Sequence, residues 1–356
     1  MRRLTRREML AELAAASAGI GLSACTSALP GVAPTPAPTS APTVQSRQVQ
    51  IGYVSVSVSN APTFSAIDGG YFKEQGLDVS ATNIATSPQA VASMVSGELP
   101  LNTGISGTQI VAANRKGGGT LLLASSVNTF PFSILTQPEI RNVADLKGKK
   151  FGISQFGSAS DTATRLYLNR NNLDPSNDLT LIQTGGVTQT LAALQAHGID
   201  AGLLTPPADQ LAIQAGFALL ADIGSLGIDY CTNGVGTTRG YLEKNRDLMS
   251  AVLKAIVQGV HRFKTDQSFG ESVIQHWTNT DDPNILTASW KPFATEYLQN
   301  RLYVTDAGIQ TVLDELANSD PTAKGADPKT YYDNSLLKTL DDSGFFASLG
   351  IPAGIN

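Results

Sequence analysis

Two polar residues at the start of a predicted helix have a spacing that could serve ligand binding. Ser158 and Asp161 follow the short apolar strand Phe151-Gly152-Ile153-Ser154 and are three residues apart. This is the spacing of a capping box, in which each side chain accepts a hydrogen bond from the other residue's backbone. A strand that runs into a helix also leaves free N–H groups and a positive dipole end beside a crevice, where an anion can bind. Ser158 and Asp161 are therefore expected to cap their helix, and both can also line a pocket.

The other candidate ligand-binding residues lie in turns after predicted strands, because ligands of open α/β sheets sit at the carboxyl ends of strands. Hydroxyls and backbone N–H groups can bind a small anion by hydrogen bonds alone. Phe130 and Tyr230 could cover a flat or apolar part of a ligand. The alternative for each residue is an ordinary surface turn. The candidates are Ser57, Ser59, Asn60, Ser106, Gly107, Thr108 and Phe130, followed by Gln155, Gly157, Ser158, Ser160, Asp161, Thr184, Thr205 and Tyr230.

This candidate set contains no Arg or Lys. Arg165 lies one turn after Asp161, and we expect the two side chains to form a surface ion pair, with an Arg165 that reaches into the site as the alternative. Asp161 would repel an anion unless it caps the helix or meets an amine of the ligand. A zwitterion such as an amino sulfonate would suit both charges, and a neutral heterocycle stays open as an alternative.

No arrangement typical of catalysis or metal binding stands out in the sequence. The three histidines, His197, His261 and His276, are not spaced as metal ligands, and Cys25 and Cys231 form no Cys-x-x-Cys pair. There is also no Ser/His/Asp order and no close pair of carboxylates. We therefore predict a protein that is not an enzyme and uses no metal or cofactor, with an exported enzyme as the alternative.

Composition points to a soluble globular protein without a nucleic-acid partner. The chain has 356 residues, of which 42% are hydrophobic and 15% charged, with a net charge of −5. Its length suggests two domains or one large one. Without residues 1–24, 21 basic and 28 acidic residues remain. An acidic balance without basic clusters argues against nucleic acid.

The N-terminus is predicted to be an export signal, residues 1–24. Four arginines precede a weakly apolar stretch, Ala11 to Leu22, that is too short to span a membrane. Thr5-Arg6-Arg7-Glu8 resembles a twin-arginine signal, with the general secretory route as the alternative. Leu22-Ser23-Ala24-Cys25 resembles a lipobox, in which the chain is cut before Cys25 and the Cys25 thiol is acylated. The alternative is a soluble exported protein with a chance cysteine.

Residues 25–47 are predicted to tether a folded domain to a lipid on Cys25. The segment is rich in Pro, Ala, Thr and Ser, a composition that favours extended, solvated chain. No later segment is apolar and long enough to cross a bilayer. A lipidated Cys25 would leave Cys231 without a disulfide partner. We expect an exported lipoprotein on the outer face of the cell membrane or in the periplasm.

Strands and helices alternate up to about residue 223, and helices dominate from Tyr241 onward. Alternation of this kind favours an α/β fold with parallel sheets and helical cover. A weak internal repeat is also present. In the first half, a helix ended by Gly97 is followed by a strand, the turn Ser106-Gly107-Thr108 and another helix. In the second half, a helix ended by Gly198 is followed by a strand, the turn Thr205-Pro206-Pro207 and another helix. Two similar α/β lobes would produce this repeat.

Several short elements, in their order and spacing, resemble one family. Together they are similar to the substrate-binding proteins of ABC importers in the nitrate/sulfonate/taurine and thiamine-precursor group (SsuA/THI5-like, NMT1-like). The resemblance covers about residues 48–320. The matching elements are Gly52-Tyr53, Asp68-Gly69-Gly70-Tyr71-Phe72-Lys73-Glu74-Gln75-Gly76-Leu77-Asp78-Val79, Val143-Ala144-Asp145-Leu146-Lys147-Gly148-Lys149-Lys150, Phe156-Gly157-Ser158, Gly198-Ile199-Asp200-Ala201 and Thr205-Pro206-Pro207.

The resemblance implies an α/β, two-lobed periplasmic-binding-protein-like fold of type II. Two parallel-type sheets with helical cover would be joined by a two-strand hinge, and the lobes would close on a ligand. Lobe one is expected at 48–133 plus 236–356 and lobe two at 137–230. The chain would cross between them near 133–137 and 230–235. Pro100, where the family usually has Asp, is expected to alter a turn.

The resemblance also implies a function and partners. The protein would capture a small polar or anionic ligand, either nitrate/sulfonate/taurine-like or thiamine-precursor-like, and deliver it to an ABC permease with its ATPase subunits. We expect a monomer held at the membrane by its lipid. The family includes enzymes that make a pyrimidine with iron and a His-rich site, which this sequence lacks. A ligand sensor on the same fold is a further alternative.

Overall fold

The computed structural model describes residues 46–84 and 86–354 of the chain. The predicted export signal, Cys25 and nearly all of the predicted tether lie outside the described residues. No helix within the described part is both long and apolar enough to cross a membrane.

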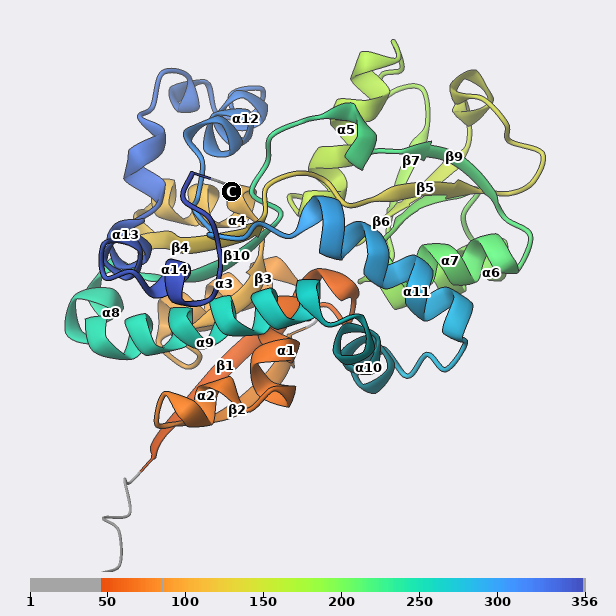
Figure 1. The fold of residues 1–356 in the computed structure, drawn as a ribbon. Coiled ribbons are helices and arrows are strands. Elements are labelled where there is room, and N and C mark those ends of the chain that lie inside the picture. Colours follow the sequence, from red (N-terminus) through yellow and green to blue (C-terminus); the bar gives the residue numbers. More distant parts are fainter. Residues whose placement is uncertain (1–45, 85, 355–356) are drawn as a thin grey trace, which may run out of the picture. The chain divides into compact units, whose positions relative to one another are not determined.

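Two five-stranded sheets carry the fold, and both belong to one compact unit of the chain (Figure 1). We call the parts built on them lobe one and lobe two. The first sheet has the order β2-β1-β3-β10-β4, with strands Arg47–Val54 (β1), Leu77–Ile84 (β2), Asn102–Ile105 (β3), Thr120–Val127 (β4) and Asn233–Thr238 (β10). The second has the order β7-β6-β8-β5-β9, with strands Ser133–Thr136 (β5), Lys150–Ile153 (β6), Thr180–Gln183 (β7), Ala201–Leu204 (β8) and Ala218–Asp222 (β9).

The internal repeat of the sequence corresponds to one strand topology used twice. In each sheet one strand pairs in parallel with the next two strands along the chain, as β1 does with β2 and β3 and β6 does with β7 and β8. One strand of each sheet is antiparallel to its neighbours, β10 in the first and β5 in the second. The predicted two-lobed α/β fold is confirmed, but the sheets are mixed rather than parallel. The reason is that the chain enters β5 and β10 directly after it has crossed between the lobes. It therefore enters each sheet at the edge where the other strands end, so β5 and β10 run in the opposite direction.

Helices connect the strands and cover the sheets. Those that connect strands are Ala61–Asp68 (α1), Tyr71–Glu74 (α2), Ser87–Ser96 (α3), Gly107–Ala113 (α4), Ala159–Arg170 (α5), Val187–Gln195 (α6) and Ala208–Gln214 (α7). The later helices are Arg239–Lys244 (α8), Arg246–Thr265 (α9), Gln267–Thr278 (α10), Pro283–Pro292 (α11), Asp306–Leu316 (α12), Ser335–Asp342 (α13) and Phe345–Ser348 (α14). Short 3₁₀ or π turns lie at Val58–Asn60, Asn114–Gly118, Val143–Leu146, Gly224–Leu226, Phe293–Tyr297, Pro321–Ala323 and Pro328–Tyr331.

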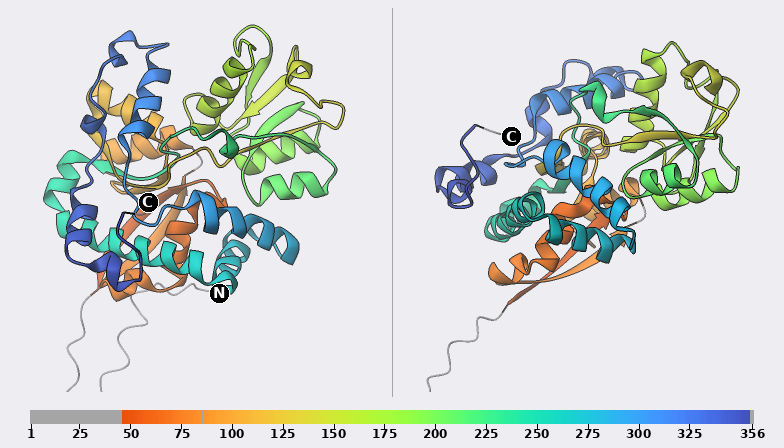
Figure 2. Two further views of the ribbon diagram at one scale, coloured as in Figure 1. Left: turned by 45° about the horizontal axis from the view of Figure 1, so that its top comes forward. Right: turned by 45° about the vertical axis from the view of Figure 1, so that its right-hand side comes forward.

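The long helix α9 shows how the core of lobe one is built. Its residues Met249, Val252, Ile256, Val260 and Phe263 recur every three or four positions and are buried. This spacing places them on one face of the helix. The face packs on α1, α2 and α13, and Figure 2 shows α9 in teal beside the orange segment that contains α1 and α2.

Two connecting segments, 128–132 and 223–232, carry the chain between the sheets. They run side by side, because the backbone N–H of Tyr230 donates to the carbonyl of Asn128 (3.1 Å) and that of Thr232 donates to the carbonyl of Val127 (3.0 Å). Residues 133–136, which the sequence places at the crossing, form strand β5 of the second sheet. The lobe boundaries given above otherwise stay predictions.

Candidate functional site

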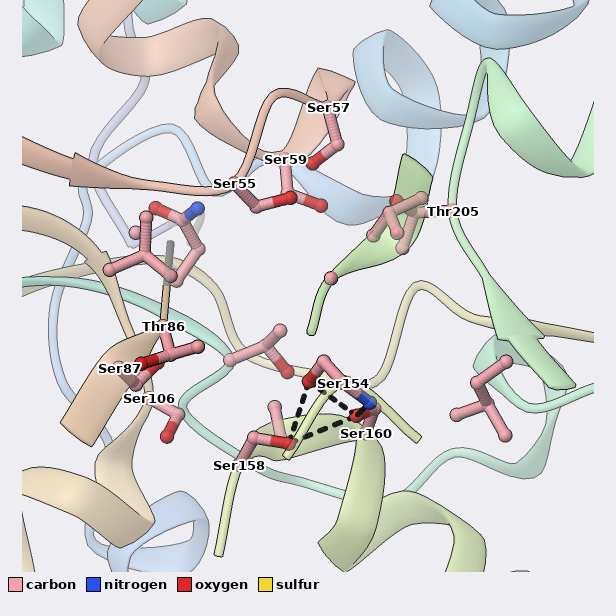
Figure 3. Close-up of a pocket in the computed structure, with 18 of the residues that line it drawn as sticks. Ser55, Ser57, Ser59, Thr86, Ser87, Ser106, Ser154, Ser158, Ser160 and Thr205 are labelled. Atoms are coloured by element: carbon pink, nitrogen blue, oxygen red, sulfur yellow. Dashed lines mark hydrogen bonds between the residues drawn. The ribbon is translucent and has the colours of Figure 1, made fainter. Parts of the chain in front are cut away.

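A pocket lies where the carboxyl ends of strands from both sheets converge. Its cavity measures about 90 Å³. Every lining residue belongs to the end of a strand, to the loop or helix that follows it, or to the connecting region (Figure 3). Lobe one and the connecting region contribute Val54, Ser55, Ser57, Ser59, Asn60, Thr86, Ser87, Gly104, Ser106, Phe132, Thr232 and Asn233. Lobe two contributes Ser154, Gln155, Ser158, Ala159, Ser160, Gly186, Val187, Thr190, Leu203 and Thr205.

The lobe-one wall is organised by the buried side chain of Asn60. Its amide donates to the carbonyl oxygens of Ser55 (2.9 Å) and Val54, so it fixes the loop between β1 and α1. Ser55 has a left-handed backbone, with φ of 72°. Gly104 on the neighbouring strand also has φ of 72°, and a Cβ there would overlap Asn60 Oδ1. This close packing presents the hydroxyls of Ser57 and Ser59 to the pocket (Figure 3).

The lobe-two wall is a ring of three serines. The Oγ atoms of Ser154, Ser158 and Ser160 lie 2.8–2.9 Å from one another, as the dashed lines in Figure 3 mark. Two backbone groups also hold the ring. The N–H of Ser154 donates to Ser160 Oγ (2.9 Å), and the N–H of Asp161 donates to Ser158 Oγ (3.4 Å). The ring is therefore part of the start of α5, and the predicted cap by Ser158 is confirmed.

Asp161 turns away from this pocket. Its Oδ2 accepts from the N–H of Gly157 (2.8 Å) and not from that of Ser158, whose N–H donates to Gln155 O, so the reciprocal half of the predicted capping box does not form. Its Oδ1 accepts from Arg165 Nε (2.7 Å), so the predicted ion pair forms, but Asp161 is buried rather than on the surface. Because its charge is satisfied in this way, Asp161 offers no carboxylate to a ligand in the pocket.

The structure brings about half of the predicted site residues together. Those lining the pocket are Ser57, Ser59, Asn60, Ser106, Gln155, Ser158, Ser160 and Thr205. Those outside it are Gly107, Thr108, Phe130, Gly157, Asp161, Thr184 and Tyr230.

Phe130 and Tyr230 are core residues rather than pocket residues. Both are fully buried, and their rings stack with centroids 4.1 Å apart. The hydroxyl of Tyr230 lies 2.8 Å from Thr108 Oγ1, and burial raises the pKa of this phenol. The two aromatic side chains therefore fasten the connecting segments together at a point where both segments are buried.

Several lining residues were not predicted from the sequence. Thr86 and Ser87 precede a predicted helix and follow a predicted strand, so the rule that selected Ser158 would have selected them. Ser154 directly follows β6 and could have been found in the same way. Phe132 comes from a connecting segment and Asn233 is the first residue of β10, and no local sequence signal marks them.

The pocket is uncharged but lies at positive helix ends. None of its lining residues is Asp, Glu, Lys, Arg or His. The first residues of α3, α5 and α6, which are Ser87, Ala159 and Val187, all line it. Each helix N-terminus carries roughly half a positive charge from the aligned peptide dipoles. The pocket is therefore electrostatically suited to a ligand group with negative charge or electron-rich atoms.

Four buried polar atoms of the pocket are available to a ligand. They have no hydrogen-bond partner among the described residues and are Thr86 Oγ1, Ser106 Oγ, Gln155 Oε1 and Thr205 Oγ1. A buried polar group without a partner costs about 1–3 kcal/mol of stability. A ligand that bonds to these atoms would recover part of that free energy.

Hydrogen bonds between the lobes close the pocket on two sides. The N–H of Val58 donates to the carbonyl of Pro206 (3.1 Å) next to the lining residue Thr205. On the other side, Gln109 Nε2 donates to the carbonyl of Gly157 and Thr108 Oγ1 lies 3.3 Å from Thr162 Oγ1. The lobes are therefore in contact around the pocket.

A second, larger groove lies on the far side of these Gln109 and Thr108 contacts, with a volume of about 630 Å³. Unlike the pocket, it is charged, because Asp161, Arg165 and Glu315 line it. Burial raises the pKa of Glu315, and the nearby Arg165 opposes this effect.

Other reactive groups lie outside the pocket. Cys231 is buried, which raises its thiol pKa to about 12, and His276 Nδ1 bonds to Asp68 Oδ2 (2.9 Å). Within 46–84 and 86–354, no three His, Cys, Asp or Glu side chains gather as a metal site would require.

Comparisons with known proteins show which family the sequence matches. The family model described as NMT1/THI5 like matches residues 58–267. YtlA of Bacillus subtilis (strain 168), named as a binding protein, is 24% identical over 256 residues, which are 70% of this chain and 76% of that protein.

Two solved structures have the same fold. The alkanesulfonate-binding protein SsuA from Xanthomonas axonopodis pv. citri, bound to MOPS, aligns with a TM-score of 0.69 at 17% identity, over 80% of this chain and 98% of that chain. The periplasmic nitrate-binding protein NrtA from Synechocystis PCC 6803 aligns with a TM-score of 0.72 at 15% identity, over 87% of this chain and 92% of that chain. At these identities the two structures show the fold, which is the predicted one. Because the family model matches more than half of the sequence, the chain belongs to the NMT1/THI5 like family.

Proposed function

We propose that the protein is a non-catalytic solute receptor that binds a small polar or anionic ligand in the pocket between its lobes. One observation carries the proposal. Helices α3, α5 and α6 begin at a pocket that is rich in hydroxyls and contains no charged side chain. Helix N-termini and oriented hydroxyls bind anions without a formal counter-charge.

The size of the pocket limits what it can enclose. A cavity of about 90 Å³ has roughly the volume of three water molecules in the liquid. A ligand group of a few non-hydrogen atoms, such as a nitrate, a carboxylate or a sulfonate head, is of this size. Serine and threonine hydroxyls on both walls would donate to its oxygens, and the amide of Gln155 can also contribute.

The surroundings of the serines favour binding over catalysis. A serine nucleophile requires a neighbouring base to take its proton. The side chains of Ser154, Ser158 and Ser160 bond to one another, and no His, Asp, Glu or Lys lines the pocket. The serines are therefore suited to hold a ligand rather than to attack it.

Transport by an ABC importer is the role we propose for this receptor. SsuA and NrtA are named for binding an alkanesulfonate and nitrate, and NrtA is named as periplasmic. The predicted export signal and the predicted lipid on Cys25 would place this protein outside the cytoplasm, beside a permease. Ligand capture there and delivery to the permease with its ATPase subunits would use the pocket.

A thermal-shift titration of the purified protein tests the receptor. The panel holds nitrate, bicarbonate, taurine, alkanesulfonates, aromatic sulfonates and aminopyrimidines. A compound at a hundred times its Kd should stabilise the folded state by about 2.7 kcal/mol, which a melting curve resolves. We expect a saturable shift with one chemical class, and no turnover of that compound. The absence of any shift across the panel would contradict the proposal, and turnover of the binding compound would favour the exported enzyme.

A further inference from the structure

The pocket continues into a second cavity that reaches the surface. This mouth cavity has a volume of about 100 Å³ and shares Ser55, Gly186 and Val187 with the pocket. Its other lining residues are Val56, Asn83, Gly185, Thr188 and Gln189. Because three residues line both cavities, the pocket and the mouth cavity are adjacent along one path, bounded by the loop after β1 and the loop before α6.

The mouth cavity differs from the pocket in what it can recognise. Val56, a large apolar residue, is 37% exposed at the mouth. Asn83 and Gln189 bring neutral amides, and Thr188 brings a hydroxyl. No acidic or basic side chain lines the mouth cavity. Its apolar surface comes from Val56 and Val187 beside these neutral polar groups, and it has no charge to neutralise an ionic group.

Contacts around the pocket favour this side as the exit for a longer ligand. Val58 and Pro206 are hydrogen-bonded across the lobes, and so are Gln109 and Gly157. Between the loop of Ser55 and the loop of Gly186, the structure has a cavity instead of a contact of this kind. A ligand whose head fills the pocket would thus extend into the mouth cavity.

The charged pair Asp161 and Arg165 lines neither the pocket nor the mouth cavity. Asp161 and Arg165 bond to each other and line the larger groove on the opposite side of the Gln109 contact. An amine on the ligand tail would therefore meet no carboxylate along the path from the pocket to the surface. This removes the structural basis for a zwitterionic ligand that the sequence alone left open.

We propose that the mouth cavity is a second subsite, which takes an uncharged tail of the ligand and discriminates against a cationic one. The inference rests on the proposed receptor function and narrows its ligand class. The ligand has a small polar or anionic head and an uncharged aliphatic or aromatic tail. A bare inorganic ion would use only the pocket.

Isothermal titration calorimetry with matched compounds tests this subsite. Propanesulfonate and taurine have the same head and the same chain length, but the terminal group is a methyl in one and an ammonium in the other. Butanoate and β-alanine form the corresponding carboxylate pair, and methanesulfonate, acetate and nitrate have no such tail. Each methylene that enters the mouth cavity should strengthen binding about fourfold. The ammonium compound should bind about tenfold more weakly than its methyl partner, because its charge is desolvated without a partner.

Two variants at the mouth and one control assign the effect to this cavity. Val56→Asp should weaken propanesulfonate and strengthen taurine, because it places a carboxylate at the mouth, and Gln189→Glu should act in the same direction. Val95→Asp is the matched control, since Val95 is a 49% exposed valine that lines neither cavity. It should leave both affinities unchanged.

The outcomes separate this inference from the receptor function. If compounds with the same head bound with the same affinity whatever their tail, the proposed subsite would be wrong but the receptor function would not. The subsite would also be overturned if Val56→Asp and Gln189→Glu left the preference between propanesulfonate and taurine unchanged. If neither these compounds nor the wider panel bound at all, the receptor function itself would fail, and the subsite with it.

Discussion

In the lobe-two wall of the pocket, Ser154, Ser158 and Ser160 bond to one another, whereas in the lobe-one wall the hydroxyls of Ser57 and Ser59 bond to no other described residue. Both walls carry serines at the carboxyl ends of strands. Of these five serines, only Ser158 caps a helix through its side chain, and Ser154 and Ser160 are bonded to it. Figure 3 shows the two sets facing each other across the pocket.

Because of this difference, substitutions in the two walls should affect folding stability and ligand affinity differently. A hydroxyl that already has protein partners contributes to the folded state, and a ligand must compete with those partners for it. A hydroxyl without a partner contributes little to folding, and its bond to a ligand is almost wholly gained on binding. We therefore expect substitutions in the lobe-two wall to lower both stability and affinity, and those at Ser57 and Ser59 to lower affinity alone.

The largest effect is expected where the lobe-one wall is most tightly packed. In Gly104→Ala, the new Cβ would overlap Asn60 Oδ1 and lie 2.9 Å from the carbonyl oxygen of Val54, at a φ of 72°. Left-handed backbone and overpacking together should cost about 3 kcal/mol of unfolding free energy. Urea denaturation measures the loss, and ligand affinity should fall with it.

Gly70→Ala is the matched control for this substitution. Gly70 has a φ of 75°, but a Cβ there meets nothing within 4 Å. Its cost should be about 1–2 kcal/mol, from the backbone conformation alone. Equal losses for the two variants would show that the packing of Asn60 against Gly104 does not support the wall.

The next effect concerns Asp209, one turn after Thr205 in lobe two. It is buried and accepts a hydrogen bond from Ser133 Oγ (3.0 Å), and burial raises its pKa from 3.8 to about 6. The folded protein therefore keeps this proton at pH values where the unfolded chain has lost it. Stability should fall as the pH rises from about 4 to 6, by on the order of 3 kcal/mol, and stay reduced above pH 6.

Asp209→Asn should remove this part of the pH dependence, because the amide oxygen can still accept from Ser133 but carries no proton to lose. Unfolding free energies of the two proteins, measured between about pH 4 and 8, should diverge in favour of the variant above about pH 5. Parallel curves would show that Asp209 does not titrate as its burial implies.

A smaller effect on folding is expected for Ser158→Ala. The change removes the cap of α5 and one member of the serine ring, and loss of a cap costs about 1 kcal/mol. Affinity should also fall, by about three- to tenfold for a neutral hydrogen bond. Thr238→Ala is the control, because Thr238 caps α8 away from the pocket. It should lower stability by a similar amount and leave affinity intact. If Ser158→Ala left the affinity unchanged, the serine ring would not take part in ligand binding as proposed.

The smallest effect on folding should come from Ser57→Ala. We expect a change in unfolding free energy below about 0.5 kcal/mol and a loss of affinity of about three- to tenfold. Calorimetric titration and denaturation of the same preparation give both numbers. Ser93→Ala, on α3 outside the pocket, serves as the control. Destabilisation without weaker binding in Ser57→Ala would reverse the assignment of the two walls.

Much of the fold could be predicted from local signals. Gly97 ends α3 with a φ of 82°, as its position after an amphipathic segment indicates, and Ser158 caps α5. The repeated order of helix, glycine, strand and turn indicates two equivalent lobes. The rule that ligands lie at strand ends selected Ser57, Ser59 and Thr205 correctly as residues of one pocket.

The errors concern side chains whose direction is set by contacts that the strand-end rule does not consider. Asp161 stands three residues after Ser158, yet it faces the other groove because Arg165 and the N–H of Gly157 hold it there. Phe130 and Tyr230 are far apart in the sequence, and only the two adjacent connecting segments bring their rings together. Local patterns predict where a strand ends, but not which of two cavities a neighbouring side chain enters.

The most direct test of the pocket as the ligand site is a crystal structure of the protein with the compound that binds most tightly in the thermal-shift panel. We predict that its head lies within hydrogen-bond distance of Ser57 or Ser59 on one wall and of the Ser154, Ser158 and Ser160 ring on the other. A compound found instead in the larger groove, beside Arg165 and Glu315, would contradict this assignment.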